Sequence, residues 1–321
     1  MHRPGPPLTR RTVLRAGAAL GLGAGLAACT GPRPAAPLVI AGGVQPGVYI
    51  NLARTLSEIW RERLGLAAAP QVLETAGSAQ NMELLTTGAA AVTISQVDVA
   101  ADVAARTTGP AEPRALARLY DDVTHIVVRA DSGLRSIADL RGRRVSIGPG
   151  GSGYQPIAIR LLDVAGIGVA GLGTRAELGL PDAAAALREN GLDAFFWSGG
   201  VPTDGVRELA AQVPIRLLEL GGVLDRMRDR YPVYSVATVP ANTYGLPGPV
   251  SCLSVRNALL VTEGMAADLA GALIRAAFDE QPRLAQASPA AVTVDSRSAI
   301  GTQPIPLHEG AVAFYRATKG Y

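Results

Sequence analysis

The chain has few of the residues that carry covalent, metal or nucleophilic chemistry. Its 321 residues include two cysteines, three histidines and one lysine, and aromatic residues make up only 4%. Cys29 and Cys252 are the two cysteines, and if Cys29 is modified, as argued below, no disulfide can form. No H-E-x-x-H or C-x-x-C segment is present, so we expect no metal and no cofactor. The cores are expected to be aliphatic.

Hydrolase constellations are also missing from the sequence. His125 lies in an apolar, strand-like run and is expected to be a satisfied core residue. His308 follows Pro304-Ile305-Pro306-Leu307 and is expected to start the last helix. Gly151-Ser152-Gly153 lacks the spacing of a nucleophile elbow. We therefore expect no catalytic residues, and a secreted enzyme is the weakest of the functions considered.

The first 29 residues have the order of an export signal. Arg10-Arg11 is a twin-arginine pair, residues 16–28 are apolar and uncharged, and Leu26-Ala27-Ala28-Cys29 ends the segment. The apolar stretch is too short to cross a bilayer, which needs roughly 20 residues. The cysteine resembles the lipid-attachment site of a bacterial lipoprotein. We expect residues 1–28 to be removed and Cys29 to be acylated. The alternative is an ordinary signal peptide in which Cys29 stands by chance.

Removal of this segment changes the charge of the chain. Residues 1–28 contain four arginines and no acid, which leaves 26 basic against 27 acidic residues. The pI of about 9.1 therefore reflects the targeting segment. No basic stripe remains, so nucleic acid is not an expected partner.

About 290 residues remain, which favours two lobes. Residues 29–37 are rich in Pro and Ala and are predicted to be a flexible tether. Lobe 1 is predicted to combine 38–125 with 240–321, and lobe 2 to span 126–239. We expect a monomer held outside the cytoplasmic membrane.

Strand and helix patterns alternate along the chain and predict an α/β fold with parallel strands. A helix over 78–87 is expected to take Ser78 as its N-cap, and residues 265–284 are expected to form one helix. Ligands gather where loops leave the carboxyl ends of such strands. The loops in question are 42–47, 76–78, 96–98, 148–153 and 198–203.

The glycine-rich loop 148–153 formally satisfies G-x-G-x-x-G. No acidic residue stands about 20 positions further on, so a dinucleotide site is not favoured. An anion at the helix N-terminus remains possible, as does a tight turn without a ligand. Asp98 is either the partner of a ligand ammonium or a first-turn residue that interacts with the helix dipole.

Other polar and aromatic side chains in these loops have two readings each. Asn81 and Gln96 either bind a small polar ligand or satisfy nearby backbone. Tyr49 and Trp197 either line a ligand cleft or pack in a core or hinge.

Taken in order, these loops resemble the TAXI family of TRAP-transporter solute receptors. The resemblance covers about residues 38–318 and rests on segments 41–49, 75–85, 95–98, 145–153, 193–197 with 202–203, and 304–308. It implies a type II periplasmic-binding-protein fold, a small organic-anion or glutamate-like ligand, and a membrane permease as partner. By position, it implies ligand contacts from Tyr49, Asn81, Gln96, Asp98, Ser152 and Gly153.

The first loop departs from the family pattern Gly-Gly-Thr-Gly-Gly. Here Gly43-Val44-Gln45-Pro46-Gly47 fills these places, and Pro46 removes one backbone donor. The ligand is therefore expected to differ while the general role stands. The complete candidate ligand set is Gly43, Gln45, Gly47, Val48, Tyr49, Asn81, Gln96, Asp98, Ser152, Gly153, Trp197 and Pro202.

The sequence thus predicts a lipid-anchored solute-binding receptor that closes on a small carboxylate or amino acid and delivers it to a TRAP-type permease. A sensor subunit for a membrane signalling protein would use the same fold and is the alternative.

Overall fold

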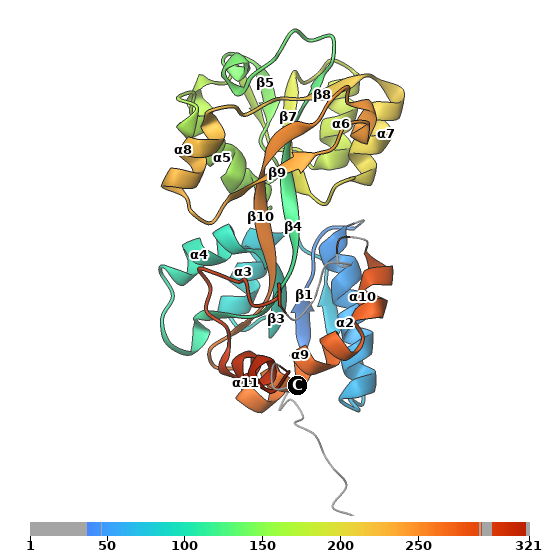
Figure 1. The fold of residues 1–321 in the computed structure, drawn as a ribbon, viewed down its shortest axis with the longest axis vertical. Coiled ribbons are helices and arrows are strands. Elements are labelled where there is room, and N and C mark those ends of the chain that lie inside the picture. The colour runs from blue at the N-terminus through green and yellow to red at the C-terminus, as the bar shows by residue number, and fades with distance from the viewer. Residues whose placement is uncertain (1–36, 46, 289, 291–296, 319–321) are drawn as a thin grey trace, which may run out of the picture.

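Two α/β halves lie one above the other, joined by two long strands (Figure 1). The computed structural model describes residues 37–45, 47–288, 290 and 297–318. The predicted signal peptide, Cys29, Pro46 and nearly all of the predicted tether lie outside these residues.

The lower half is built from both ends of the described chain. Its elements are β1 (Val39–Ala41), α2 (Val48–Arg63), β2 (Gln71–Leu73), α3 (Ser78–Thr86), β3 (Val92–Gln96), α4 (Val97–Ala104), α9 (Ala267–Asp279), α10 (Gln281–Ala287) and α11 (Glu309–Thr318).

The upper half comes from the middle of the chain. Its elements are β5 (Arg144–Ser146), α5 (Tyr154–Val164), β6 (Thr174–Ala176), α6 (Leu180–Arg188), β7 (Ala194–Gly199), α7 (Asp204–Gln212), β8 (Ile215–Leu217), α8 (Val223–Arg230) and β9 (Ser235–Val239). Short 3₁₀ turns lie at Gly109–Ala111, Ile137–Leu140, Val169–Gly171 and Thr243–Gly245.

Two strands are shared by the halves, β4 (Pro113–Arg129) and β10 (Val250–Thr262). The strand order is β2-β1-β3-β10-β4-β7-β5-β6, with β8 beside β4 and β9 beside β10. Strands within each half are parallel where a helix connects them, as expected. The expected parallel arrangement is wrong at the centre, where β4 and β10 run antiparallel to each other and to their neighbours β7 and β3.

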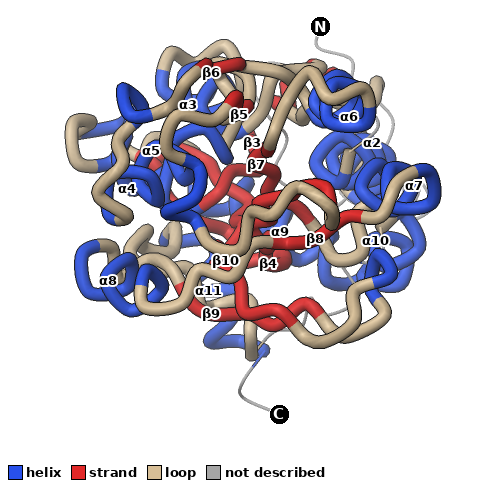
Figure 2. Tube along the Cα trace, turned by 90° about the horizontal axis from the view of Figure 1, so that it is seen from above, coloured by secondary structure: helices blue, strands red, loops and turns tan. Residues whose placement is uncertain are grey.

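The length of β4 follows from its apolar side chains. Val123 and Val127 enter one apolar cluster, and Ile126 and Val128 enter another, because successive strand residues point to opposite faces. Helices cover both faces, so both sets of side chains are buried (Figure 2).

One of the apolar clusters extends through both halves. It contains Met82 and Val97 of the lower half together with Leu161 and Met227 of the upper half. The halves are therefore in apolar as well as polar contact, and residues near their junction are held from both sides.

The helix expected over 265–284 is two helices, which is a correction. α9 ends at Asp279 and α10 begins at Gln281, with Pro282 in the first turn of α10. Proline lacks the N–H that a continuous helix needs, so the chain turns there. The Trp60 indole N–H donates to the Leu273 carbonyl at 3.0 Å and ties α2 to α9.

Within the part of the chain that the structure describes, no helix has the length and apolar character needed to cross a bilayer.

Candidate functional site

Buried polar side chains gather where the two halves meet. We call this group the junction cluster, and its members are Tyr49, Ser78, Gln96, Asp98, Asp122, Thr124, Ser198 and Asn257. All but Tyr49 are at most 6% exposed. They come from α2, α3, β3, α4, β4, β7 and β10, so both halves and both shared strands contribute.

Gln96, the last residue of β3, connects the halves at the centre of the cluster. Its Nε2 donates to Asp122 Oδ2 at 2.9 Å and lies 3.3 Å from Ser198 Oγ of the upper half. Since a carboxylate only accepts hydrogen bonds, the amide nitrogen is the atom that faces Asp122. The Gln96 side-chain oxygen therefore points toward Gly153.

Tyr49 and Ser78 bring the first two helices to the same place. The Tyr49 hydroxyl lies 3.1 Å from Ser78 Oγ and donates to Asn257 Oδ1 on β10. The Gln96 backbone N–H donates to Ser78 Oγ at 3.1 Å. Ser78 was expected to be the N-cap of α3, which is wrong: Gly77 is the N-cap and Ser78 is the first helical residue.

The glycine-rich loop 148–153 of the upper half rests on the start of α3. The Gly151 carbonyl accepts from the Ala79 and Gln80 N–H groups at 3.1 and 3.3 Å. A Cβ added to Gly153 would overlap the Gln96 side-chain oxygen and lie 2.7 Å from Ser78 Oγ. Glycine at this position is thus required by the close approach of the two halves.

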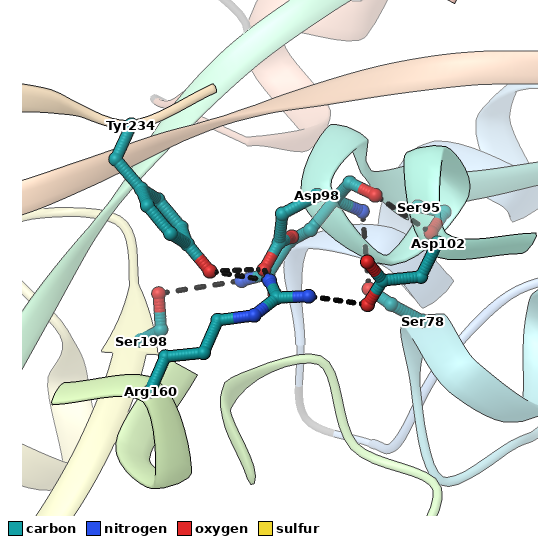
Figure 3. Close-up of polar contacts among 8 residues, drawn as sticks. Ser78, Ser95, Asp98, Asp102, Arg160, Ser198 and Tyr234 are labelled. Carbon is teal, nitrogen blue, oxygen red and sulfur yellow. Dashed lines mark hydrogen bonds and ion pairs between the residues drawn. The ribbon is translucent and has the colours of Figure 1, made fainter. Parts of the chain in front are cut away.

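Arg160 of α5 forms a second bridge between the halves (Figure 3). Its Nη1 donates to Asp98 Oδ2 at 3.0 Å and to the Tyr234 hydroxyl at 2.7 Å, while Nη2 pairs with Asp102. The Tyr234 hydroxyl in turn donates to Asp98 Oδ2 at 2.7 Å. The Asp98 side chain has no exposed surface and that of Arg160 is 14% exposed, so this ion pair is largely shielded from water.

Five buried side-chain atoms among the described residues have no hydrogen-bond partner, and all five belong to the junction cluster. They are Gln96 Oε1, Asp98 Oδ1, Asp122 Oδ1, Thr124 Oγ1 and Asn257 Nδ2. Buried polar atoms are nearly always paired, so such a concentration marks a place where another molecule can supply the partners.

The two carboxylates of the cluster, Asp122 and Asp98, differ in how their negative charge is compensated. Burial raises the pKa of Asp122 to about 6, opposed by the side-chain amides of Gln96 and Asn257. Burial also raises the pKa of Asp98, opposed by the Tyr234 hydroxyl and the Arg160 charge. Asp98 thus has a cationic partner, whereas the hydrogen bond that Asp122 accepts at 2.9 Å comes from a neutral amide.

The structure brings Tyr49, Gln96, Asp98 and Gly153 together, as the loops indicated. Asn81 lies beneath them and binds backbone. Its Nδ2 donates to the Gly42 carbonyl and to the Ile94 carbonyl at 2.8 Å.

The other candidates lie further out or bind their own loop. Ser152 Oγ donates to the Pro149 carbonyl at 2.7 Å, while Gln45 is exposed and Gly47 and Val48 are half-buried at the start of α2. Gly43 lies under Tyr49, with 3.1 Å between an added Cβ and the Tyr49 Cβ.

Trp197 and Pro202 belong to the upper half. The Trp197 indole donates to Thr203 Oγ1 at 3.0 Å and packs edge-on against Tyr154 with ring centroids 5.1 Å apart, whereas Pro202 is exposed. His125 is a satisfied core residue, as expected. Its Nδ1–H donates to the Val123 carbonyl at 2.8 Å, and burial lowers its pKa to about 4.

Sequence reasoning missed Asp122, Thr124, Asn257, Ser198 and Arg160. The available signal was a polar residue inside a long strand with alternating apolar side chains, since Asp122 and Asn257 lie at buried positions within β4 and β10. Nothing local marks Arg160, because its partners are 58 and 62 residues away.

Among the residues that the structure describes, no group of three or more His, Cys, Asp or Glu side chains could hold a metal ion.

Solved structures show the same architecture. XAC2383 from Xanthomonas citri bound to ATP is 16% identical, with 88% of this chain and 99% of that chain covered and a TM-score of 0.53. The same protein bound to chloride ion is 17% identical, with the same coverage and a TM-score of 0.52. CAE31940 from Bordetella bronchiseptica RB50 is 18% identical, with 88% of this chain and 89% of that chain covered and a TM-score of 0.51.

At these identities the likeness shows the fold alone. The chain has the two-lobe α/β architecture of periplasmic binding proteins, in which two crossing strands join the lobes, and the expected fold is confirmed. The model of the NMT1-like family matches residues 40–318, so the chain belongs to the NMT1-like family.

Gly153→Ala tests the close approach of the halves. Overpacking of this kind costs about 1–3 kcal/mol, so we expect a lower free energy of unfolding or, if the halves separate to relieve the overlap, a larger radius of gyration by X-ray scattering. Gly150→Ala is the matched control, because its added Cβ meets nothing nearer than a Glu177 oxygen at 3.9 Å. Identical behaviour of the two variants would contradict the packing.

Asp122→Asn tests the buried carboxylate. Since the folded pKa is about 6 and the unfolded value about 3.9, the native state binds the proton more tightly, and its stability should fall as pH rises from 4 to 7. The full effect above pH 6 is on the order of 3 kcal/mol. The variant should be more stable than the parent at pH 7 and equal to it at pH 4, measured by urea unfolding of ligand-stripped protein.

Asp98 titrates in both proteins and is coupled to Asp122 by charge repulsion, and Tyr49 and Tyr120, which also face Asp122, stay neutral because their pKa values are raised. The difference between parent and variant therefore reports the Asp122 charge together with its effect on Asp98. A difference that does not change between pH 4 and 7 would show that Asp122 is not buried as described.

Proposed function

We propose that this protein is an extracytoplasmic solute-binding receptor that closes its two halves on a small solute and delivers it to a membrane transporter without chemical turnover. The observation that carries the proposal is the set of five unpaired, buried polar atoms at the junction of the halves. Membership of the NMT1-like family and the two-lobe fold are consistent with this role.

Opening requires the halves to move about β4 and β10, the two strands that they share. We propose the lobes as residues 38–125 with 240–321 and residues 126–239, with the hinge within these strands. The polar contacts that opening would break are Arg160 to Asp98 and Asp102, Gln96 to Ser198, and the Gly151 carbonyl to α3. The apolar cluster that extends through both halves would also lose contacts. Hinge closure around a ligand is the common motion of two-lobe binding proteins.

The proposed solute is a small carboxylate or amino acid. The amino-terminal end of α2 lies beside the junction cluster, and N–H groups at such an end favour an anion, whereas the Ala79 and Gln80 N–H groups of α3 already donate to the Gly151 carbonyl. Buried hydrogen-bond acceptors in the cluster suit an amino group. Both features favour a solute with opposite charges on one small skeleton.

Further details of the proposal rest on sequence motifs. The twin-arginine signal and Cys29 support export and lipid anchoring to the outer face of the membrane. The six loop segments that resemble TAXI receptors support a TRAP-type permease as the partner.

Calorimetric titration tests the receptor function. Protein unfolded and refolded to remove carried-over solute is titrated with glutamate, glutamine, 2-oxoglutarate and C4-dicarboxylates. We expect saturable one-to-one binding of at least one of them, with a smaller radius of gyration in its presence. Well-folded protein that binds no member of the panel would contradict the proposed solute class, and consumption of a bound solute would contradict the absence of turnover.

Arg160→Met tests closure. The substitution leaves Asp98 buried without its cation, so the closed form loses stability and solute affinity should fall roughly tenfold to a hundredfold. Arg175→Met is the control, since Arg175 pairs with Glu177 on the surface of the upper half alone and exposed pairs contribute about 0–1 kcal/mol. Equal affinities of the two variants would show that the Arg160 bridge does not hold the halves together.

A further inference from the structure

Arg256 of β10 is a half-buried arginine that has no ion pair among the described residues. Its Nη1 donates to the Gly301 carbonyl at 3.4 Å and its Nη2 donates to the Val233 carbonyl at 3.3 Å. Both bonds are longer than the usual range of about 2.7–3.2 Å. A guanidinium has five N–H donors, so these two weak bonds leave most of its capacity unused.

Arg256 lies on the face of the shared strands that is opposite the junction cluster, which we call the outer face. In the ladder between β10 and β4, Arg256 pairs with Asp121, and paired residues share a face of the sheet. Asp122, the next residue of β4, points to the other face, since successive strand residues alternate. Val233 belongs to the upper half and Gly301 to the lower half, so one guanidinium contacts both.

A second arginine, Arg118 of β4, lies beside Arg256. Its Nη1 is 3.7 Å from a Cβ added to Gly301, whose carbonyl accepts from Arg256. Arg118 binds Asp121 with two bonds, from Nε at 2.9 Å and from Nη2 at 2.6 Å. One carboxylate thus stands beside two arginines, and positive charge is in excess. The side chains of Arg118 and Asp121 are 31% and 30% exposed, so an anion from solution can reach the group.

The positive charge of Arg256 is only partly compensated. Burial and the Arg118 charge lower the pKa of Arg256, and Asp121 opposes them without cancelling them. A half-buried charge beside a like charge is unfavourable, and a bound anion would relieve both costs. The guanidinium fork matches two oxygen atoms of one carboxylate or of one tetrahedral oxoanion.

We propose that Arg256 and Arg118 form a binding site for a small oxoanion or a carboxylate on the outer face of the shared strands. The site is separate from the junction cluster, and it does not depend on the proposed receptor function. The anion comes either from solution or from an acidic side chain of a partner protein. Because Arg256 contacts a carbonyl of each half, an anion bound there lies where the two halves join and not among the groups of the junction cluster.

Thermal unfolding of the purified chain in sodium sulfate tests the site. Sulfate stabilises proteins in general because it is excluded from their surface, and this effect rises steadily with concentration. We expect an additional, saturable rise of the midpoint temperature by roughly 2–4 °C at ten times the dissociation constant. Arg256→Gln should lose the saturable part and keep the steady rise.

Arg216→Gln is the matched control. Arg216 is also half-buried and lies on a strand, β8, but it donates to the Leu134 carbonyl within the upper half alone. This variant should keep both parts of the rise.

Asp121→Asn gives a result that a damaged fold cannot imitate. The substitution removes the carboxylate that competes with the anion for both arginines. The affinity for sulfate should therefore increase roughly threefold to tenfold. An unchanged affinity in this variant would overturn the placement of the anion beside Arg118 and Arg256.

An acidic peptide distinguishes the two sources of the anion. A hexapeptide of alternating aspartate and glutamate is titrated in the same assay at low salt. Saturation by sulfate supports an anion from solution, and saturation by the peptide alone supports a side-chain carboxylate of a partner. A saturable rise that persists in Arg256→Gln overturns the proposal, as does a parent protein that shows only the steady rise with both probes.

Discussion

The two shared strands are the constraint on which the rest of the molecule depends. Each half contains β4 and β10 as part of its own sheet, so neither half has a complete core without them. Both strands must be apolar enough to be buried along their whole length, because helices cover both faces of the sheet. Polar side chains at the buried positions of these strands are therefore held in a fixed place and shielded from water, which would make them specific but demanding contacts for the proposed solute.

Asp122, Thr124 and Asn257 occupy such places. A hydrogen bond in this environment is stronger than in water, and an unmade one is correspondingly unfavourable. As the proposed binding site, the cluster would therefore gain more from a matching solute than an exposed site would, and it would discriminate strongly against a solute that leaves one atom unpaired. Arg160 has a different role. It gives Asp98 a positively charged partner from within the chain, whereas Asp122 is bonded to the neutral amide of Gln96.

Much of the fold could be predicted from the chain, because alternating strand and helix patterns and the loop glycines are local signals. The antiparallel centre could not, since the pairing of β4 with β10 joins segments more than a hundred residues apart. The break between α9 and α10 depended on one proline whose effect was underestimated. Within the site, Tyr49, Gln96, Asp98 and Gly153 could be predicted because they lie at strand ends or helix starts, beside the loops that leave the sheet. Asp122 and Asn257 could not be predicted in the same way, because they lie within strands and not beside the loops that follow them.

The shared strands also bear on how relatives of this chain can diverge. A recombination event that exchanges one half between two homologues has to cut through β4 and β10 or carry them along whole. Since Asp122, Thr124 and Asn257 lie on these strands, the parent that contributes the strands would also contribute the inner part of the proposed binding site. If the proposed function holds, solute preference would then be inherited with these two central strands, while most of the surface of either half remained free to change.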